Sequence, residues 1–240
     1  MFWWRNEVRP GVSVAFTDAR AGNLALHVGD NPDDVASRRA QVEQAAGLGG
    51  RTFQYMNQVH GNSVAVINHW GAGPTSDAMV SVADAAGGSV QPLSVMVADC
   101  VPVVLVGSTE TDAPAVAVAH AGRPGVASAV VTATVDRMRD LGARHITAWL
   151  GPSICGRCYE VPAALREQVS AAVPESWAET SWGTPALDLP AGVRAQLAAS
   201  GVDVLYSGEC TLEHEGLFSY RRDSRTGRFA GLVWTHDRQG

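Results

Sequence analysis

Apolar residues recur along the chain with two different periods, which predicts a mixture of strands and helices. Segments that alternate apolar and polar residues, or that are apolar throughout for the length of one strand, are typical of β-strands. The segments with this pattern are, in chain order, VSVAFT (12–17), RTFQYM (51–56), SVAVIN (63–68), DAMVSV (77–82), LSVMVA (93–98), PVVLVG (102–107), PAVAVA (114–119), HITAWL (145–150), VDVLYS (202–207) and FAGLVW (229–234).

Helical spacing of apolar residues separates several of these strands. Asn31-Pro32 is typical of a helix start, and Gly47 and Gly142 are typical of helix ends. The segments predicted to be helical are 31–47, 126–142, 162–173 and 193–200, whereas 174–190, with three prolines and two tryptophans, is typical of a loop. Because strands and helices are mixed and several connections are short enough for hairpins, we expect one α+β domain over residues 1–240.

Composition narrows the class of protein. Of the 240 residues, 46% are hydrophobic and 18% are charged, and the net charge of −6 is ordinary for a folded globular protein. Basic residues cluster only at 221–228, so we expect no nucleic-acid partner. No apolar run reaches membrane-spanning length, and the first ten residues are too charged for a signal peptide. Together with four cysteines that we expect to be reduced, this predicts a cytoplasmic protein without a membrane partner.

A thiol and two imidazoles lie at the ends of predicted core strands. The apolar runs 93–98 and 114–119 lead into Cys100 and His120, and His60 lies in a glycine-containing turn between two other runs. A buried strand that ends in polar residues and glycines delivers its last side chains to a surface cleft. We therefore predict that His60, Cys100 and His120 form one site.

Three chemistries are compatible with these residues. Zinc binds neutral imidazole and thiolate, and a catalytic zinc site leaves one position open, where the pKa of bound water falls towards neutrality. Two histidines, a cysteine and a methionine such as Met56 or Met96 also match a copper electron-transfer site, although seven histidines are too few for a four-copper oxidase. Cys100 activated by His120 without a metal matches a cysteine hydrolase. The second histidine favours the metal, and Asp99 is expected to orient a neighbouring group.

The remaining cysteines include a C-x-x-C motif, Cys155-Gly-Arg-Cys158. No second C-x-x-C completes a structural zinc site, and a thioredoxin-like redox pair is expected where a strand meets a helix. Because a helix is predicted from Pro162 onwards, redox chemistry stays an alternative for this motif.

Seven motifs, taken together, resemble those of the YfiH family, also called the laccase-domain or multicopper polyphenol oxidase family. They are QVHG (58–61), DAMV (77–80), ADCVPVVL (98–105), HAG (120–122), GPSICGRCYEV (151–161), ECT (209–211) and FSYRRDSRTGR (218–228). The resemblance covers nearly the whole chain. It implies a layered α/β sandwich with mixed, largely antiparallel sheets.

The resemblance also implies a zinc-dependent purine nucleoside phosphorylase. Such an enzyme converts adenosine, inosine or guanosine and phosphate to the base and ribose 1-phosphate, and it also deaminates adenosine and cleaves methylthioadenosine. The metal ligands of the family fall on His60, Cys100 and His120, which are then also the catalytic residues. A copper-dependent phenol oxidase, the metal-free cysteine hydrolase and a metal-binding protein without activity stay as alternatives.

Substrate-binding residues are predicted from side-chain chemistry and from the same motifs. Arginine binds phosphate through a planar pair of donors, and the candidates are Arg39, Arg221 and Arg222. Gln58 is a candidate for the purine or the ribose. One motif departs from the family: HAGWRG is replaced by HAGRPG (120–125), so an aromatic ring is lost and an arginine stands one position earlier. We expect metal binding to survive this change and substrate preference to be affected.

Overall fold

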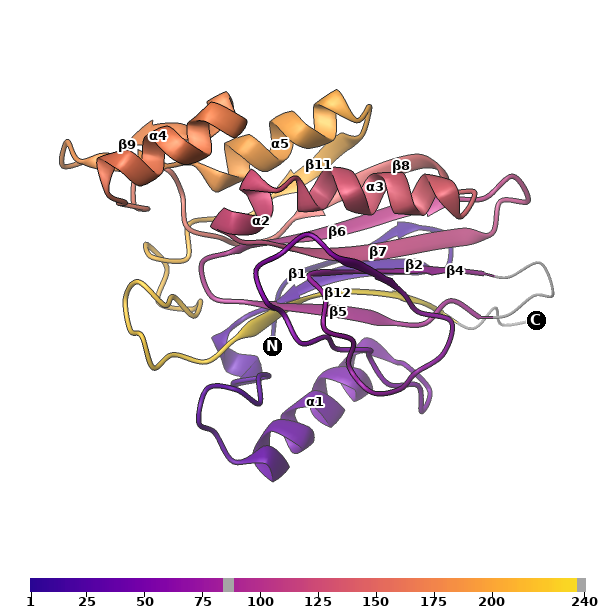
Figure 1. Cartoon of the computed structure of the whole chain (residues 1–240). Coiled ribbons are helices and arrows are strands. Elements are labelled where there is room, and N and C mark those ends of the chain that lie inside the picture. The colour runs from indigo at the N-terminus through magenta and orange to yellow at the C-terminus, as the bar shows by residue number, and fades with distance from the viewer. Residues whose placement is uncertain (84–88, 237–240) are drawn as a thin grey trace.

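The computed structural model describes residues 1–83 and 89–236, in which two β-sheets lie face to face between helices (Figure 1). The larger sheet has six strands in the order β11 (Asp203–Ser207), β8 (Arg144–Leu150), β6 (Val101–Ser108), β7 (Pro114–Ala121), β4 (Ala78–Val82) and β3 (Val64–Val66). The smaller sheet has four strands in the order β1 (Phe2–Arg9), β2 (Val12–Thr17), β12 (Phe229–Thr235) and β5 (Leu93–Val97). Within the described ranges, only the β11–β8 and β3–β4 pairs are parallel.

Helices cover the outer faces of both sheets. Figure 1 shows a group of helices over the six-stranded sheet and a single helix, α1 (Pro32–Ala46), on the opposite side of the molecule. The group consists of α2 (Arg123–Ala127), α3 (Val130–Asp140), α4 (Ala163–Ala172) and α5 (Leu189–Ala199). Short 3-10 turns occupy Ala19–Ala21 and Pro174–Ser176. The fold class is therefore confirmed as an α+β layered sandwich with mixed, largely antiparallel sheets.

Alternating side chains of the central strands fill two different cores. On β6, Val103 and Leu105 pack with α2–α5, whereas Val104 and Val106 pack against the four-stranded sheet. A third core lies between the four-stranded sheet and α1. A strand buried on both faces has little need of polar residues, which explains the unbroken apolar runs in the sequence.

The predicted first helix is confirmed together with its boundaries. The Asn31 side chain accepts a hydrogen bond from the backbone amide of Asp33, which caps the start of α1. Gly47 ends the helix with a left-handed φ of 77°.

Several elements differ from the sequence-based prediction. The helix expected over 126–142 is divided into α2 and α3, because Ala129 takes a left-handed φ of 61° between them. The expected loop at 174–190 contains a hairpin of β9 (Trp177–Glu179) and β10 (Pro185–Leu187). The expected strand at 51–56 is reduced to a bridge between Gln54 and Leu93.

The edge strand β1 was not predicted. Among the described residues it pairs only with β2, and two register shifts interrupt the pairing, so its side chains do not alternate between buried and exposed positions. None of the helices in the described residues is long and apolar enough to cross a lipid bilayer.

Candidate metal centre and active site

The turn that carries His60 folds around a buried carboxylate. Asp77 precedes β4 and has no exposed surface. Its oxygens accept hydrogen bonds from the backbone amides of Val59, His60 and Gly61 at 3.2, 2.8 and 2.6 Å. His60 takes a left-handed φ of 62°, which lets successive amides converge on one anion. Burial acts to raise the pKa of Asp77, but the bonds from His120 and these amides outweigh it and hold that pKa below its ordinary value.

The same carboxylate orients His120. This residue lies near the end of β7, is 3% exposed, and its Nδ1 is 2.9 Å from Asp77 Oδ1. Because an ionised carboxylate only accepts hydrogen bonds, Nδ1 carries the proton. The Nε2 atom of His120 is then the one that offers a lone pair, an arrangement typical of metal-binding histidines.

Cys100 lies where the chain crosses from one sheet to the other, between β5 and β6. The preceding residue, Asp99, takes a left-handed φ of 87°. Its carboxylate accepts hydrogen bonds from the Thr211 hydroxyl at 2.6 Å and from the Arg221 backbone amide at 2.7 Å. Asp99 therefore orients the segments that carry Thr211 and Arg221, while the thiol of Cys100 faces the two histidines.

The three predicted ligands lie together. One side-chain donor atom from each of His60, Cys100 and His120 lies within 4.8 Å of the other two. The two imidazole rings have centroids 4.6 Å apart and cross at 74°. Gly122 packs directly against this group. A Cβ at this position would lie 2.9 Å from the His60 ring and 3.1 Å from the Cys100 sulfur, so a larger residue would displace both side chains.

Cys100 and His120 shift each other's pKa in the directions that favour a thiolate beside an imidazolium. Burial acts to raise the pKa of the Cys100 thiol, but the positive charge of His120 and hydrogen bonds from both histidines lower it to about 6. Burial acts to lower the pKa of His120, but the Cys100 thiolate and Asp77 raise it to about 9. A thiolate is the form of cysteine that binds metals, and a metal ion would replace the imidazolium proton.

A cavity of about 430 Å³ opens onto this group. Besides His60, Cys100 and His120, its walls contain three arginines and two tyrosines, namely Arg123, Arg221, Arg228, Tyr159 and Tyr220. The Arg221 guanidinium lies 4.5 Å from the centre of the Tyr159 ring, and that of Arg228 lies 5.8 Å from Tyr220. Guanidinium groups and aromatic rings around a metal-binding group suit a ligand with an anionic part and a flat part.

The other predicted binding residues lie in different surroundings. Gln58 lines the cavity, but its amide makes hydrogen bonds of 2.7 and 2.9 Å with the backbone of Met96. Arg222 does not line it, and its guanidinium donates to the carbonyl oxygens of Thr211, Leu212 and His214.

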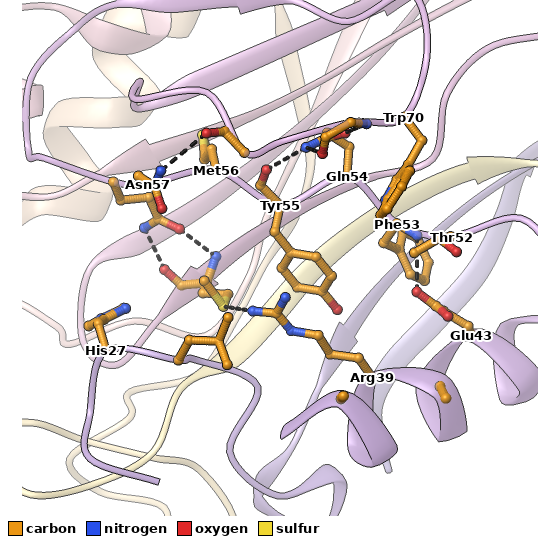
Figure 2. A pocket seen from close by; sticks show the side chains of 17 residues that line it. His27, Arg39, Glu43, Thr52, Phe53, Gln54, Tyr55, Met56, Asn57 and Trp70 are labelled. Atoms are coloured by element: carbon orange, nitrogen blue, oxygen red, sulfur yellow. Dashed lines mark hydrogen bonds between the residues drawn. The ribbon is translucent and has the colours of Figure 1, made fainter. Parts of the chain in front are cut away.

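Arg39 lies in a neighbouring hollow of about 530 Å³, which shares His27, Gln58 and Met96 with the first (Figure 2). Its guanidinium lies 3.7 Å from the centre of the Tyr55 ring and donates twice to the Leu24 carbonyl, at 2.9 and 2.8 Å. Arg39 therefore joins α1 to the segments that contain Leu24 and Tyr55.

The sequence of the chain matches a family model described as multi-copper polyphenol oxidoreductase laccase over residues 6–236. The chain belongs to this family. The predicted resemblance to YfiH proteins is confirmed by this match and by relatives that carry the name YfiH. The chain is also similar to curated purine nucleoside phosphorylases. It is 48% identical over 233 residues to purine nucleoside phosphorylase ORF3 of Streptomyces griseus, covering 92% of this chain and 93% of the relative.

More distant relatives agree in name and in fold. Purine nucleoside phosphorylase YfiH of Escherichia coli is 36% identical over 231 residues, which is 93% of this chain and 89% of that protein. Among solved structures, protein NMB0706 of Neisseria meningitidis has a TM-score of 0.81 and 32% identity, covering 98% of this chain and 99% of that one. YlmD of Geobacillus stearothermophilus has a TM-score of 0.82 and 27% identity, covering 97% and 98%.

Sequence reasoning missed the residue that organises this laccase-family site. Asp77 was visible only as the first letter of the DAMV motif, an acidic residue directly before an apolar strand. In the HAGRPG motif the arginine that stands one position earlier is Arg123, and the structure has it in the cavity wall. Tyr159 and Arg228 come from segments far along the chain, and no periodicity pointed to them.

Proposed function

We propose that this protein is a zinc-dependent purine nucleoside phosphorylase. Its relatives support an enzyme acting on nucleosides and phosphate, since the Streptomyces griseus and Escherichia coli proteins described above are named purine nucleoside phosphorylase. The observation that carries the proposal is the cavity in which three arginines face a group of two imidazoles and one thiolate. Its volume of about 430 Å³ is in the range of small-molecule sites.

His60, Cys100 and His120 are the residues that we propose hold zinc. Their nitrogen and sulfur donors are of the type that zinc prefers, and Asp77 fixes the His120 ring for coordination. Zinc bound there supplies Lewis acidity and lowers the pKa of a water molecule towards neutrality, which is the chemistry that deamination of adenosine requires. Adenosine deaminase activity is therefore part of the proposal.

Arg221, Arg123 and Arg228 are the residues that we propose bind phosphate. In phosphorolysis a phosphate oxygen forms a bond to the anomeric carbon of the ribose while the bond from that carbon to the purine nitrogen breaks. Guanidinium groups hold the phosphate in place and balance its charge. Asp99 accepts a hydrogen bond from the Arg221 backbone amide and thereby fixes the backbone of this arginine, which lines the same cavity as Cys100.

Tyr159 and Tyr220 provide the flat surfaces that a purine base requires, and they take the role of the tryptophan missing from HAGRPG. The same surfaces accept adenosine, inosine, guanosine and methylthioadenosine, because the purine rings of all four are alike. We assign the reaction to the cytoplasm, since Cys100 acts as a ligand only while it is reduced.

Metal analysis and product analysis test the proposal together. Protein loaded with zinc and incubated with inosine and phosphate is expected to release hypoxanthine and ribose 1-phosphate, and adenosine is expected to give inosine as a second product. The Cys100→Ala variant is expected to lose both products and the ion of this site, whereas Arg221→Lys is expected to raise the KM for phosphate with the ion retained. Activity only with copper and a phenol would support an oxidase. Release of hypoxanthine and free ribose by metal-free protein would support a cysteine hydrolase. Either result would overturn the proposal.

A further inference from the structure

A second group of metal-binding side chains lies outside the cavity. Cys155, Cys158, Cys210 and Glu213 each offer one ligand atom, and these four atoms lie within 4.8 Å of one another. The sequence contains only one C-x-x-C motif, but the fold brings the distant Cys210 and Glu213 beside it. We propose that these residues form a second metal site, which holds a structural zinc ion.

The distances between the donor atoms suit a tetrahedral ion. With zinc–sulfur bonds of about 2.3 Å, the donors of a tetrahedral site are about 3.8 Å apart. The Cys158 sulfur is 3.5 Å from Glu213 Oε1, and all four donor atoms lie within 4.8 Å of one another. Donor-atom movements of about 1 Å, achieved by side-chain rotation, are therefore enough to bring the four donors into contact with one ion.

Burial distinguishes the three thiols from the carboxylate. Cys158 and Cys210 are each 7% exposed, and Cys155 is half-buried. The side chain of Glu213 is 45% exposed and lies 3.7 Å from the Arg157 guanidinium. The three thiols thus lie on the buried side of the proposed site, and the carboxylate lies on its solvent side.

The position of the motif argues against thioredoxin-like redox chemistry. A redox pair of that kind lies at the first turn of a helix, where the backbone amides stabilise the thiolate. Cys155 and Cys158 instead form an isolated turn, in which the Cys158 amide donates to the Cys155 carbonyl at 3.0 Å. Helix α4 begins only at Ala163.

A metal ion would stabilise the segments around Cys155 and Cys210, which contribute few side chains to the main hydrophobic cores. The cysteines form a small cluster with Ile154, separate from the three main cores. Ser153 and Cys210 make an isolated bridge, which is the pairing that joins this segment to residues 209–211. Small units without a sufficient core commonly depend on a structural metal.

The segments that such an ion would join also supply the walls of the active-site cavity. Tyr159 directly follows Cys158, and Thr211 directly follows Cys210 and donates its hydroxyl to Asp99. The ion would therefore act on the first site by positioning Tyr159 and the segment that leads to Arg221.

Metal stoichiometry in matched variants tests this proposal. After loading with zinc and removal of free metal, the wild-type chain is expected to retain two ions. The Cys158→Ser/Cys210→Ser double variant is expected to retain one, and so is Cys100→Ser, which changes the other site. Retention of two ions by the double variant, or of none by Cys100→Ser, would refute a second site.

Cobalt provides a readout that does not depend on the double variant being folded. The cobalt-loaded Cys100→Ser variant is expected to show a thiolate-to-metal absorption about three times as strong per ion as a single-thiolate site, because three sulfur atoms bind the ion. Absence of this absorption in protein kept reduced would overturn the proposal. Failure of the phosphorylase proposal alone would leave the ion in Cys100→Ser unchanged, so the two proposals fail separately.

Discussion

Replacing Asp77 by asparagine tests the arrangement on which the candidate active site depends. The carboxylate of Asp77 is fully buried and accepts hydrogen bonds from three backbone amides and from the ring of His120. Asparagine has the same shape, but one of its two oxygens becomes an NH2 group. In either orientation of the asparagine side chain, its NH2 group then faces another hydrogen-bond donor, either the backbone amide of Gly61 or the Nδ1–H group of His120.

The two orientations of the introduced amide would have different consequences. If the amide oxygen faces His120, the NH2 group faces the Gly61 amide, and the turn that carries His60 loses its anchor. If the NH2 group faces His120, Nδ1 must accept a hydrogen bond, the ring proton moves to Nε2, and the lone pair needed for a metal is lost. Both cases weaken the site.

The magnitude follows from the bonds that are lost. Hydrogen bonds to a buried charged group contribute about 1.5–3 kcal/mol each, so we expect Asp77→Asn to lower the free energy of unfolding by about 2 kcal/mol. For a chain of this length that corresponds to a decrease in Tm of about 4–8 °C. Loss of the carboxylate behind a metal-binding histidine typically costs about 10–100-fold in metal affinity.

Thermal unfolding of the metal-free protein and zinc competition with a chromophoric chelator measure the two effects. Asp140→Asn is the matched control, because this carboxylate is 69% exposed and 4.0 Å from its partner Arg137; its effect on stability is expected to stay within about 0.5 kcal/mol. If Asp77→Asn unfolds at the wild-type temperature and binds zinc with unchanged affinity, the reasoning about Asp77 is refuted.

Three further predictions concern single positions. Gly122→Ala inserts a methyl group 2.9 Å from the His60 ring and is expected to weaken zinc binding at least tenfold, whereas Gly71→Ala, with no atom within 4 Å of the new Cβ, is expected to leave it unchanged in the same chelator assay. Gly151→Ala brings a methyl group to within van der Waals overlap of the buried Phe16 ring and is expected to lower the free energy of unfolding by about 1–3 kcal/mol in urea titrations; wild-type stability would contradict this packing. Hydrogen bonds from an asparagine and an arginine lower the pKa of Asp30, so its stabilising effect is present above the unfolded pKa of about 3.9 and is lost as the pH falls through the lower folded value. Asp30→Asn is therefore expected to reduce the loss of stability on acidification, and an unchanged acid profile would exclude this contribution.

The sequence was most informative where a strand or helix depends on its own residues. The strands β6 and β7 are buried on both faces, so their apolar runs are visible without knowledge of their neighbours. Helix α1 has a capping asparagine and a terminal glycine within its own segment. In contrast, β1 is held by its pairing with β2, and its sequence carries no alternating pattern of its own.

The candidate site was predictable in its ligand types and less so in its surroundings. His60, Cys100 and His120 each stand next to an apolar strand and a turn, which is a local signal. The role of Asp77 depends on a turn 16 to 18 positions earlier in the chain and on a ring in another strand, so only the fold reveals it. Likewise, Arg39 and Arg221 carry the same charge, and only the fold shows that Arg221 lines the cavity of Cys100, whereas Arg39 lines the neighbouring hollow.

Cys100 belongs to the short passage by which the backbone leaves one β-layer and enters the next. The position of a side chain at this junction depends on the alignment of both layers, because each layer fixes one end of the passage. The position of the thiol relative to the two imidazoles thus depends on how the two sheets stack, and grafting the three residues onto either sheet alone would not reproduce it.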